Sequence, residues 1–111
     1  MDKINERMEI GKERYGHGVR VDDDTTTWGT KNDSWLEMAE EELLDCLIYV
    51  AADYIRQKRR EGTEFIFKVN GDDNEYIKHV LTTYNANMEP CFHKTMIITV
   101  FNMLRRYSDF C

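Results

Sequence analysis

Apolar residues recur along most of the chain at steps of three and four, the spacing that gives a helix one apolar face. This periodicity predicts helices over residues 2–15, 34–58, 73–85 and 91–108. The longest of them carries the broadest apolar face, formed by Trp35, Ala39, Leu43, Cys46, Leu47, Val50, Ala51 and Tyr54. The sequence therefore predicts an all-α fold, a bundle of three or four helices.

The segments between the predicted helices differ in character. Residues 64–69, EFIFKV, are rich in strand-forming side chains and leave open one short strand or hairpin, although no partner strand is visible. Residues 17–33 have no helical period and are rich in aspartate and threonine. Connections of that length are often functional. With 111 residues, the chain is expected to form a single helical domain over residues 1–111.

The net charge of the chain bears on the classes of partner that it can bind. A net charge of −6 argues against binding to a nucleic-acid polymer, which requires a basic face. Nucleotides remain open, because a metal ion can bridge acidic side chains to phosphates. No apolar run reaches the ~20 residues that a membrane span needs, so no membrane partner is expected. The cysteines, three in number and widely spaced, predict reduced thiols in the cytoplasm.

The longest predicted helix gathers several carboxylates. Glu37, Glu41 and Asp45 follow one another at four-residue steps. Glu42 lies beside them, and no basic residue follows before Arg56. Glu37 is near the helix start, where the macrodipole by itself favours acids. Asp45 lies nearly three turns in, beyond that effect and on the border of the apolar face, so a magnesium or manganese ion is the predicted partner.

The same helix carries a family resemblance. The tetrapeptide ELLD at residues 42–45, followed by Cys-Leu-Ile-Tyr-Val, resembles the ExxD box of MazG-like all-α nucleoside triphosphate pyrophosphohydrolases. The wider run over residues 5–58 is similar to small bacteriophage proteins of the MazG-like type. The resemblance implies that acids on two helices hold magnesium and that the metal orients a triphosphate. Water then cleaves between the α and β phosphates, giving the monophosphate and pyrophosphate.

The resemblance also implies roles for individual residues. Glu41 and Asp45 are the expected catalytic residues, and the expected ligands of Mg²⁺ or Mn²⁺ are Glu37, Glu41, Glu42 and Asp45. The family carries a further EExxE box on an earlier helix, which this sequence lacks. Glu9 with Glu13, or the glutamates within residues 37–41, remain open as substitutes. Because MazG-like enzymes form dimers or tetramers, a homo-oligomer is expected.

The segment after the first predicted helix offers groups for a phosphorylated substrate. Arg14 and Arg20 can bind phosphate oxygens in pairs, and Tyr15 can stack on a base. Together with His17 they are the expected substrate-binding residues, although a helix end followed by an ordinary loop explains the same sequence. The aspartates at 22–24 lack the spacing of a calcium loop and are expected to be solvated.

Two functions remain open at this point. The first is a hydrolase, a metal-dependent pyrophosphohydrolase that cleaves the α–β phosphate bond of nucleoside triphosphates. The second is a non-catalytic helical protein of the phage type, which binds a nucleotide or signalling molecule, or a host protein. Both are expected to act in the cytoplasm, that of the host if the protein is phage-encoded. The missing EExxE box favours the second of these functions.

Overall fold

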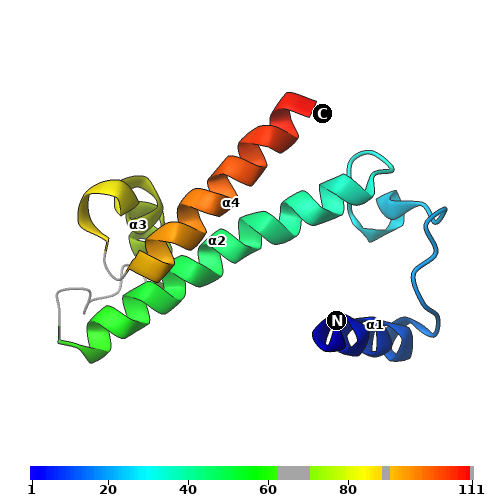
Figure 1. The fold of residues 1–111 in the computed structure, drawn as a ribbon, viewed down its shortest axis with the longest axis horizontal. Helices are drawn as coiled ribbons and strands as arrows, with labels where there is room; N and C mark the ends of the chain where they lie inside the picture. Colours follow the sequence, from blue (N-terminus) through cyan, green and yellow to red (C-terminus); the bar gives the residue numbers. More distant parts are fainter. Residues whose placement is uncertain (63–70, 89–90, 111) are drawn as a thin grey trace. The chain divides into compact units, whose positions relative to one another are not determined.

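The computed structural model describes residues 1–62, 71–88 and 91–110, and their regular structure is entirely helical. The α-helices are α1 (Asp2–Tyr15), α2 (Trp35–Arg60), α3 (Asn74–Asn87) and α4 (Cys91–Phe110), with a 3-10 helix, η1, at Thr25–Trp28 (Figure 1). The prediction of an all-α fold is confirmed, with each α-helix end within two residues of its predicted position. The strand suggested at residues 64–69 lies outside the described residues. None of the described helices has both the length and the apolar character needed to cross a membrane.

The chain divides into two compact units, Met1–Ser34 and Trp35–Cys111. In the first unit, α1 ends where the sequence predicts. Gly16 adopts a positive φ of 81°, and its N–H donates to the carbonyl of Lys12 over 2.9 Å, which closes the last turn. Although an acid near the start of a helix suggests a cap, Met1 occupies the capping position and makes no side-chain cap hydrogen bond. Asp2 is instead the first helical residue.

The segment after α1 is more ordered than its lack of period suggested. Thr25, at the start of η1, is fully buried, and its Oγ1 lies 2.8 Å from Oγ1 of Thr30. The same Oγ1 accepts a hydrogen bond from the N–H of Ser34 at 2.8 Å, and the N–H of Thr25 donates to Asp33 over 3.0 Å. These bonds hold together residues up to nine positions apart and close residues 25–34 into a compact loop that leads directly into α2.

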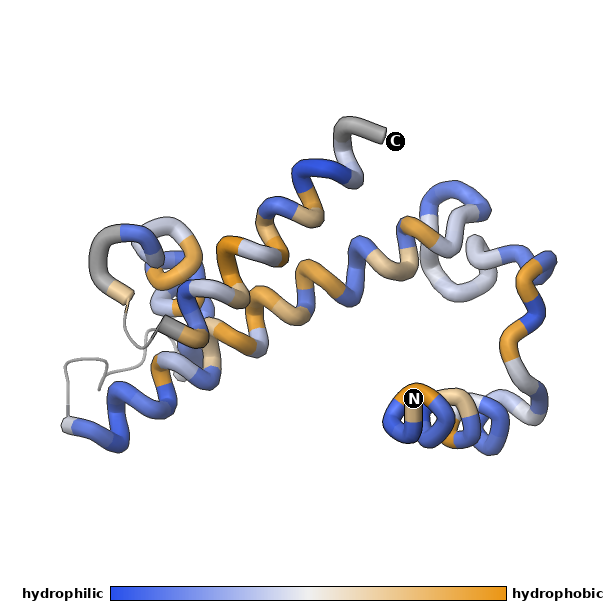
Figure 2. Tube along the Cα trace, viewed as in Figure 1, coloured by the Kyte–Doolittle hydropathy of each residue, from blue (hydrophilic) through white to orange (hydrophobic). Residues whose placement is uncertain are grey.

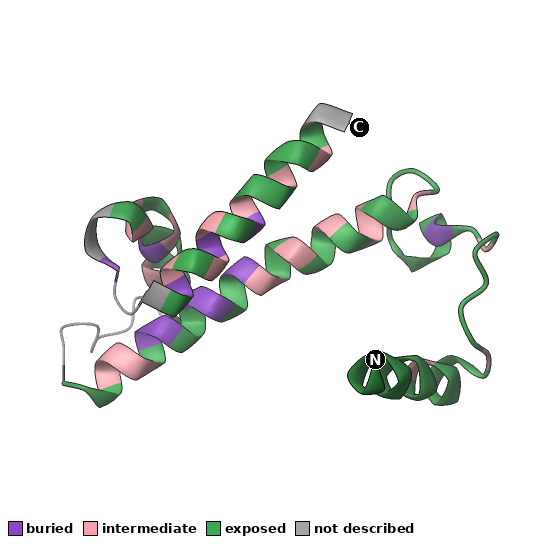
Figure 3. Cartoon of the chain, in the orientation of Figure 1, coloured by how far each residue is buried: buried purple, intermediate pink, exposed green. Residues whose placement is uncertain are grey.

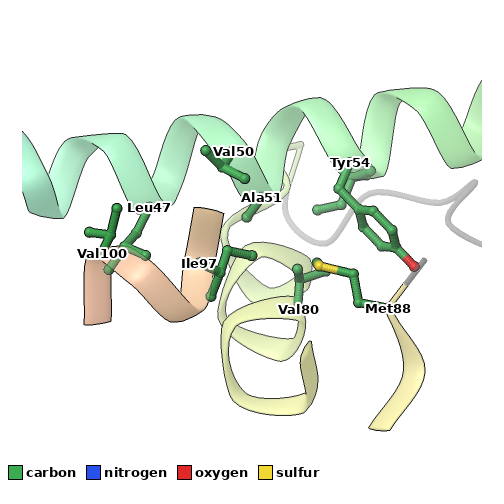
Figure 4. Close-up of a cluster of buried hydrophobic side chains, with 9 residues drawn as sticks. Leu47, Val50, Ala51, Tyr54, Val80, Met88, Ile97 and Val100 are labelled. Carbon is green, nitrogen blue, oxygen red and sulfur yellow. The ribbon is translucent and has the colours of Figure 1, made fainter. Parts of the chain in front are cut away.

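In the second unit, α3 and α4 pack against the C-terminal half of α2 (Figure 1). The core consists of Leu47, Val50, Ala51, Tyr54, Ile55, Val80, Met88, Ile97 and Val100. Figure 4 shows Leu47, Ala51 and Tyr54 of α2 pointing toward residues of α4 and of the end of α3. On the rim, Tyr84 of α3 stacks on Phe101 of α4 with ring centroids 5.6 Å apart.

The buried part of α2 is shorter than its apolar face. All of its buried residues lie from Leu47 onward, beside α3 and α4 (Figure 3). Of the predicted apolar face, Trp35 and Ala39 are exposed, and Leu43 is half-buried. Figure 2 shows apolar positions continuing along this N-terminal half of α2. The predicted apolar face therefore runs beyond the core, because α3 and α4 do not extend over the first three turns of α2.

Candidate functional site

The predicted acidic residues all lie on the N-terminal half of α2. Glu37 is half-buried in the first turn, whereas Glu41, Glu42 and Asp45 are exposed. Steps of three and four residues place Asp45 next to both Glu41 and Glu42 on the helix surface. The opposite side of the helix is fixed to the core from Leu47 onward. These carboxylates are therefore presented to solvent from the part of α2 that α3 and α4 do not cover.

The three exposed acids have no ion-pair partner among the residues that the structure describes. Within the same residues, no group of three or more acidic, histidine or cysteine side chains converges on a point where it could hold a metal ion. The adjacent carboxylates of Glu41, Glu42 and Asp45 thus all come from one helix, α2. A complete Mg²⁺ shell has six oxygens, which this helix does not supply from its own side chains.

The four predicted substrate-binding residues lie at and just after the end of α1. Arg14 and Tyr15 occupy its last turn, and both are exposed, as is Arg20. His17 is half-buried, and its Nδ1 donates a hydrogen bond to the carbonyl of Gly18 at 2.6 Å. The exposed guanidiniums are accessible to phosphate.

The aspartate run before η1 is partly explained by local structure. Asp24 is the N-cap of η1, and its Oδ1 accepts hydrogen bonds from the hydroxyl of Thr26 at 2.6 Å and from the Thr26 N–H at 2.9 Å. The hydroxyl, followed by the backbone N–H, lowers the pKa of the Asp24 carboxyl. Asp24 thus caps η1 while it remains exposed, as does Asp22.

No local sequence pattern indicates the contact between α2 and the first turn of α4. His93 is only 5% exposed, and its Nε2 donates to Oδ2 of Asp53 over 2.8 Å. Tyr54 meets the imidazole edge-on, with centroids 5.7 Å apart. Nδ1 of the imidazole is buried and has no hydrogen-bond partner among the described residues. Because the ring is enclosed, His93 anchors α4 to α2 and does not reach an external substrate.

A second contact missed from the sequence joins the end of α2 to the start of α3. Arg59 donates from Nη1 to Oδ2 of Asp73 at 3.1 Å and from Nη2 to the other carboxylate oxygen. This bidentate pairing raises the pKa of the Arg59 guanidinium. Arg59 also lies over the ring of Tyr76, 5.9 Å from its centroid. Nothing local in the sequence marks Asp73 and Tyr76 as partners of Arg59.

Comparisons of the chain with protein family models, with characterised proteins and with solved structures find no match. The MazG-like resemblance therefore stays a prediction that rests on the residues themselves.

Proposed function

We propose that this protein is a metal-dependent nucleotide pyrophosphohydrolase of the MazG-like type. In this proposal Glu41, Glu42 and Asp45, with help from Glu37, bind Mg²⁺ or Mn²⁺. The ion neutralises charge on the phosphates and lowers the pKa of the attacking water. Arg14, Tyr15, His17 and Arg20 contribute to substrate binding in the cytoplasm. The products are a nucleoside monophosphate and pyrophosphate.

The observation that supports this proposal is that three neighbouring acids on α2 are exposed and have no partner in the described part of the chain. Glu41, Glu42 and Asp45 are adjacent, exposed and unpaired within the described part of the chain. Neighbouring carboxylates one turn apart repel each other and destabilise a helix slightly. The macrodipole compensates acids in the first turn, but its effect has faded at Asp45. A bound cation would offset this repulsion, whereas solvation alone would leave it in place.

A second copy of the chain is the proposed source of the remaining ligands. Leu44 and Ile48 on α2 are 45% and 43% exposed, directly beside the acids, and Met103 on α4 is 48% exposed. Apolar residues at these positions favour packing against another helix. A two-fold axis through α2 or α4 would bring a second set of carboxylates to the ion. The proposed enzyme is therefore a homo-oligomer.

The direct test is a screen of the common ribo- and deoxyribonucleoside triphosphates with Mg²⁺ or Mn²⁺, in which released pyrophosphate is measured. At least one triphosphate should give pyrophosphate and the matching monophosphate in equal amounts. Release of inorganic phosphate in place of pyrophosphate would contradict cleavage at the α–β bond.

Metal binding should be visible without substrate. Saturating Mg²⁺ or Mn²⁺ is expected to raise the melting temperature of the wild type by a few degrees, because the ion binds the folded state. Asp45→Asn should remove this rise and should melt slightly higher than the wild type in EDTA, since one repelling charge is gone. Glu6→Gln, which neutralises an exposed acid on α1, is the matched control and should keep the response. Equal metal responses in the wild type and Asp45→Asn would refute the site.

Assembly gives a separate prediction. Light scattering at micromolar concentration should report a mass at least twice the 13.2 kDa of one chain. Ile48→Glu should shift the population toward the monomer, because it places a charge in the proposed contact. Val19→Glu changes another exposed apolar residue, outside α2 and α4, and should leave the mass unchanged. A wild type that is monomeric throughout this range would contradict the proposed oligomer.

The second candidate function is non-catalytic binding of a nucleotide or signalling molecule, or of a host protein. It is favoured by the missing EExxE box and by the lack of a converged ligand group in the described part of one chain. Calorimetry would then show tight nucleotide binding, with no pyrophosphate from any triphosphate. Under the hydrolase proposal, binding and turnover share the same metal requirement.

A further inference from the structure

A cleft of about 480 Å³ lies between the C-terminal end of α2 and the start of α3. Arg56, Arg59 and Arg60 line it together with Asp73. Apolar side chains complete its wall, namely those of Ala52, Ile55 and Ile77. Its volume is within the range of small-molecule sites, and its lining has more charged than apolar residues. The cleft is formed entirely by the second unit.

The charges in the cleft are not balanced. Asp73 is clamped by both terminal nitrogens of Arg59, so this pair is neutral as a whole. Arg56 and Arg60 are exposed and have no hydrogen-bond or ion-pair partner among the described residues. The lining therefore carries a net positive charge of two. Two unpaired guanidiniums provide planar sets of N–H donors suited to a phosphate dianion.

The apolar part of the lining adds a second requirement. Ile55 is almost completely buried, so its side chain forms a fixed wall, while Ala52 is exposed and leaves room above it. Ile77 of α3 is half-buried on the facing side. A free phosphate ion would leave the exposed surfaces of Ala52 and Ile77 in contact with water. A ligand that also covers these two side chains gains from the removal of their apolar surface from water.

We propose that the cleft binds a small phosphate monoester, with the phosphate held by Arg56 and Arg60 and its apolar or aromatic substituent against Ala52, Ile55 and Ile77. The site is separate from the acidic one. Arg56 lies eleven residues beyond Asp45 on the same helix, which is roughly 16 Å at ~1.5 Å per residue. Arg59 has a positioning role, because its pairing with Asp73 holds the start of α3 against α2.

The test uses the full chain and phenyl phosphate, a monoester that has the two required parts and no nucleoside. Binding is followed by amide chemical shifts in EDTA, so that the metal site cannot contribute. Phenyl phosphate should shift amides around Arg56, Arg60 and Ile77, with a Kd below about 1 mM and at least severalfold tighter than that of inorganic phosphate. No saturable shift, or equal affinity for the two probes, would overturn the proposal.

Two double variants distinguish binding by the guanidiniums of the cleft from attraction by the net charge of the protein. The double change Arg56→Gln and Arg60→Gln should weaken phenyl phosphate binding by at least about tenfold. The double change Arg105→Gln and Arg106→Gln removes the same charge from exposed positions of α4 and should alter the affinity less than about twofold. Equal losses in the two double variants would mean that only net charge attracts the anion, and would refute the site.

Two single variants test the apolar wall of the cleft and the independence of the cleft from the acidic residues of α2. Ala52→Leu keeps every charge and helix preference but fills the cleft, so it should weaken phenyl phosphate binding while inorganic phosphate is unaffected. Asp45→Asn should bind phenyl phosphate like the wild type. Loss of binding in Asp45→Asn would place the anion at the acidic helix and contradict a separate cleft. Pyrophosphate release is not measured in this experiment, so its outcome does not depend on the proposed hydrolysis.

Discussion

Replacing Ile97 with alanine is expected to lower the free energy of unfolding by about 2–5 kcal/mol, measured by urea denaturation followed by circular dichroism. Ile97 is fully buried on α4 and belongs to the cluster in which α2, α3 and α4 meet (Figure 4). Alanine removes contacts to both other helices and leaves a cavity. For a total stability of about 5–15 kcal/mol, such a loss can unfold a large fraction of the molecules at physiological temperature.

The control for this change is Met103→Ala on the same helix. Met103 is 48% exposed, so its truncation should cost less than about 1 kcal/mol, apart from any effect on assembly. For that reason both variants are compared at one protein concentration, with their masses checked. Similar losses in the two variants would show that α4 is not held through Ile97.

Asp45→Asn is expected to reduce kcat for pyrophosphate release by about 100-fold or more, if the proposed hydrolysis is correct. The amide keeps the size of the side chain but loses the charge that binds the ion, and the ion is needed most when charge develops in the transition state. Arg20→Ala should instead raise KM, by about tenfold, with little change in kcat, because an exposed guanidinium that only holds phosphates acts on the ground state as well.

Two comparisons make this contrast decisive. Glu6→Gln, a carboxylate-to-amide change on an exposed face of α1, should leave kcat and KM at the wild-type values. Added Mn²⁺ should restore part of the activity of Asp45→Asn if the defect is weakened metal binding. A kcat for Asp45→Asn within twofold of the wild type would exclude Asp45 as a metal ligand in the reaction.

The helices of this protein were predictable because their signals are local. Periodicity at steps of three and four predicted the four α-helices, and Gly16 and Gly62 lie just beyond the ends of α1 and α2. Both glycines have a positive φ, which other residues rarely adopt. The η1 helix was missed because it is a single turn, too short to show a period. Its cap depends on Asp24 bonding to Thr26, a pattern that also fits a solvated loop.

The cluster of candidate acids could likewise be predicted from local spacing in the sequence. Glu41, Glu42 and Asp45 occupy neighbouring positions on any helix that spans them. The sequence placed Asp45 on the border of the apolar face, but in the structure its side chain is exposed on the side of α2 away from the core. The sequence could not show how much of the apolar face of α2 is covered by other helices. Leu44 continues the apolar pattern that leads to Leu47, yet only the latter is buried, because coverage depends on where α3 and α4 lie.

The sequence by itself thus determined the helices, their polar and apolar faces, and the clustering of acids at one end of α2 and bases at the other. Only the tertiary structure decided which charges meet. Asp53 and His93 are forty residues apart, and Arg59 and Asp73 are fourteen apart. In each pair the two residues belong to different helical elements, so each contact depends on the packing of whole helices against one another. The cleft beside Arg56 exists for the same reason, since its walls come from two helices whose separation no local pattern records.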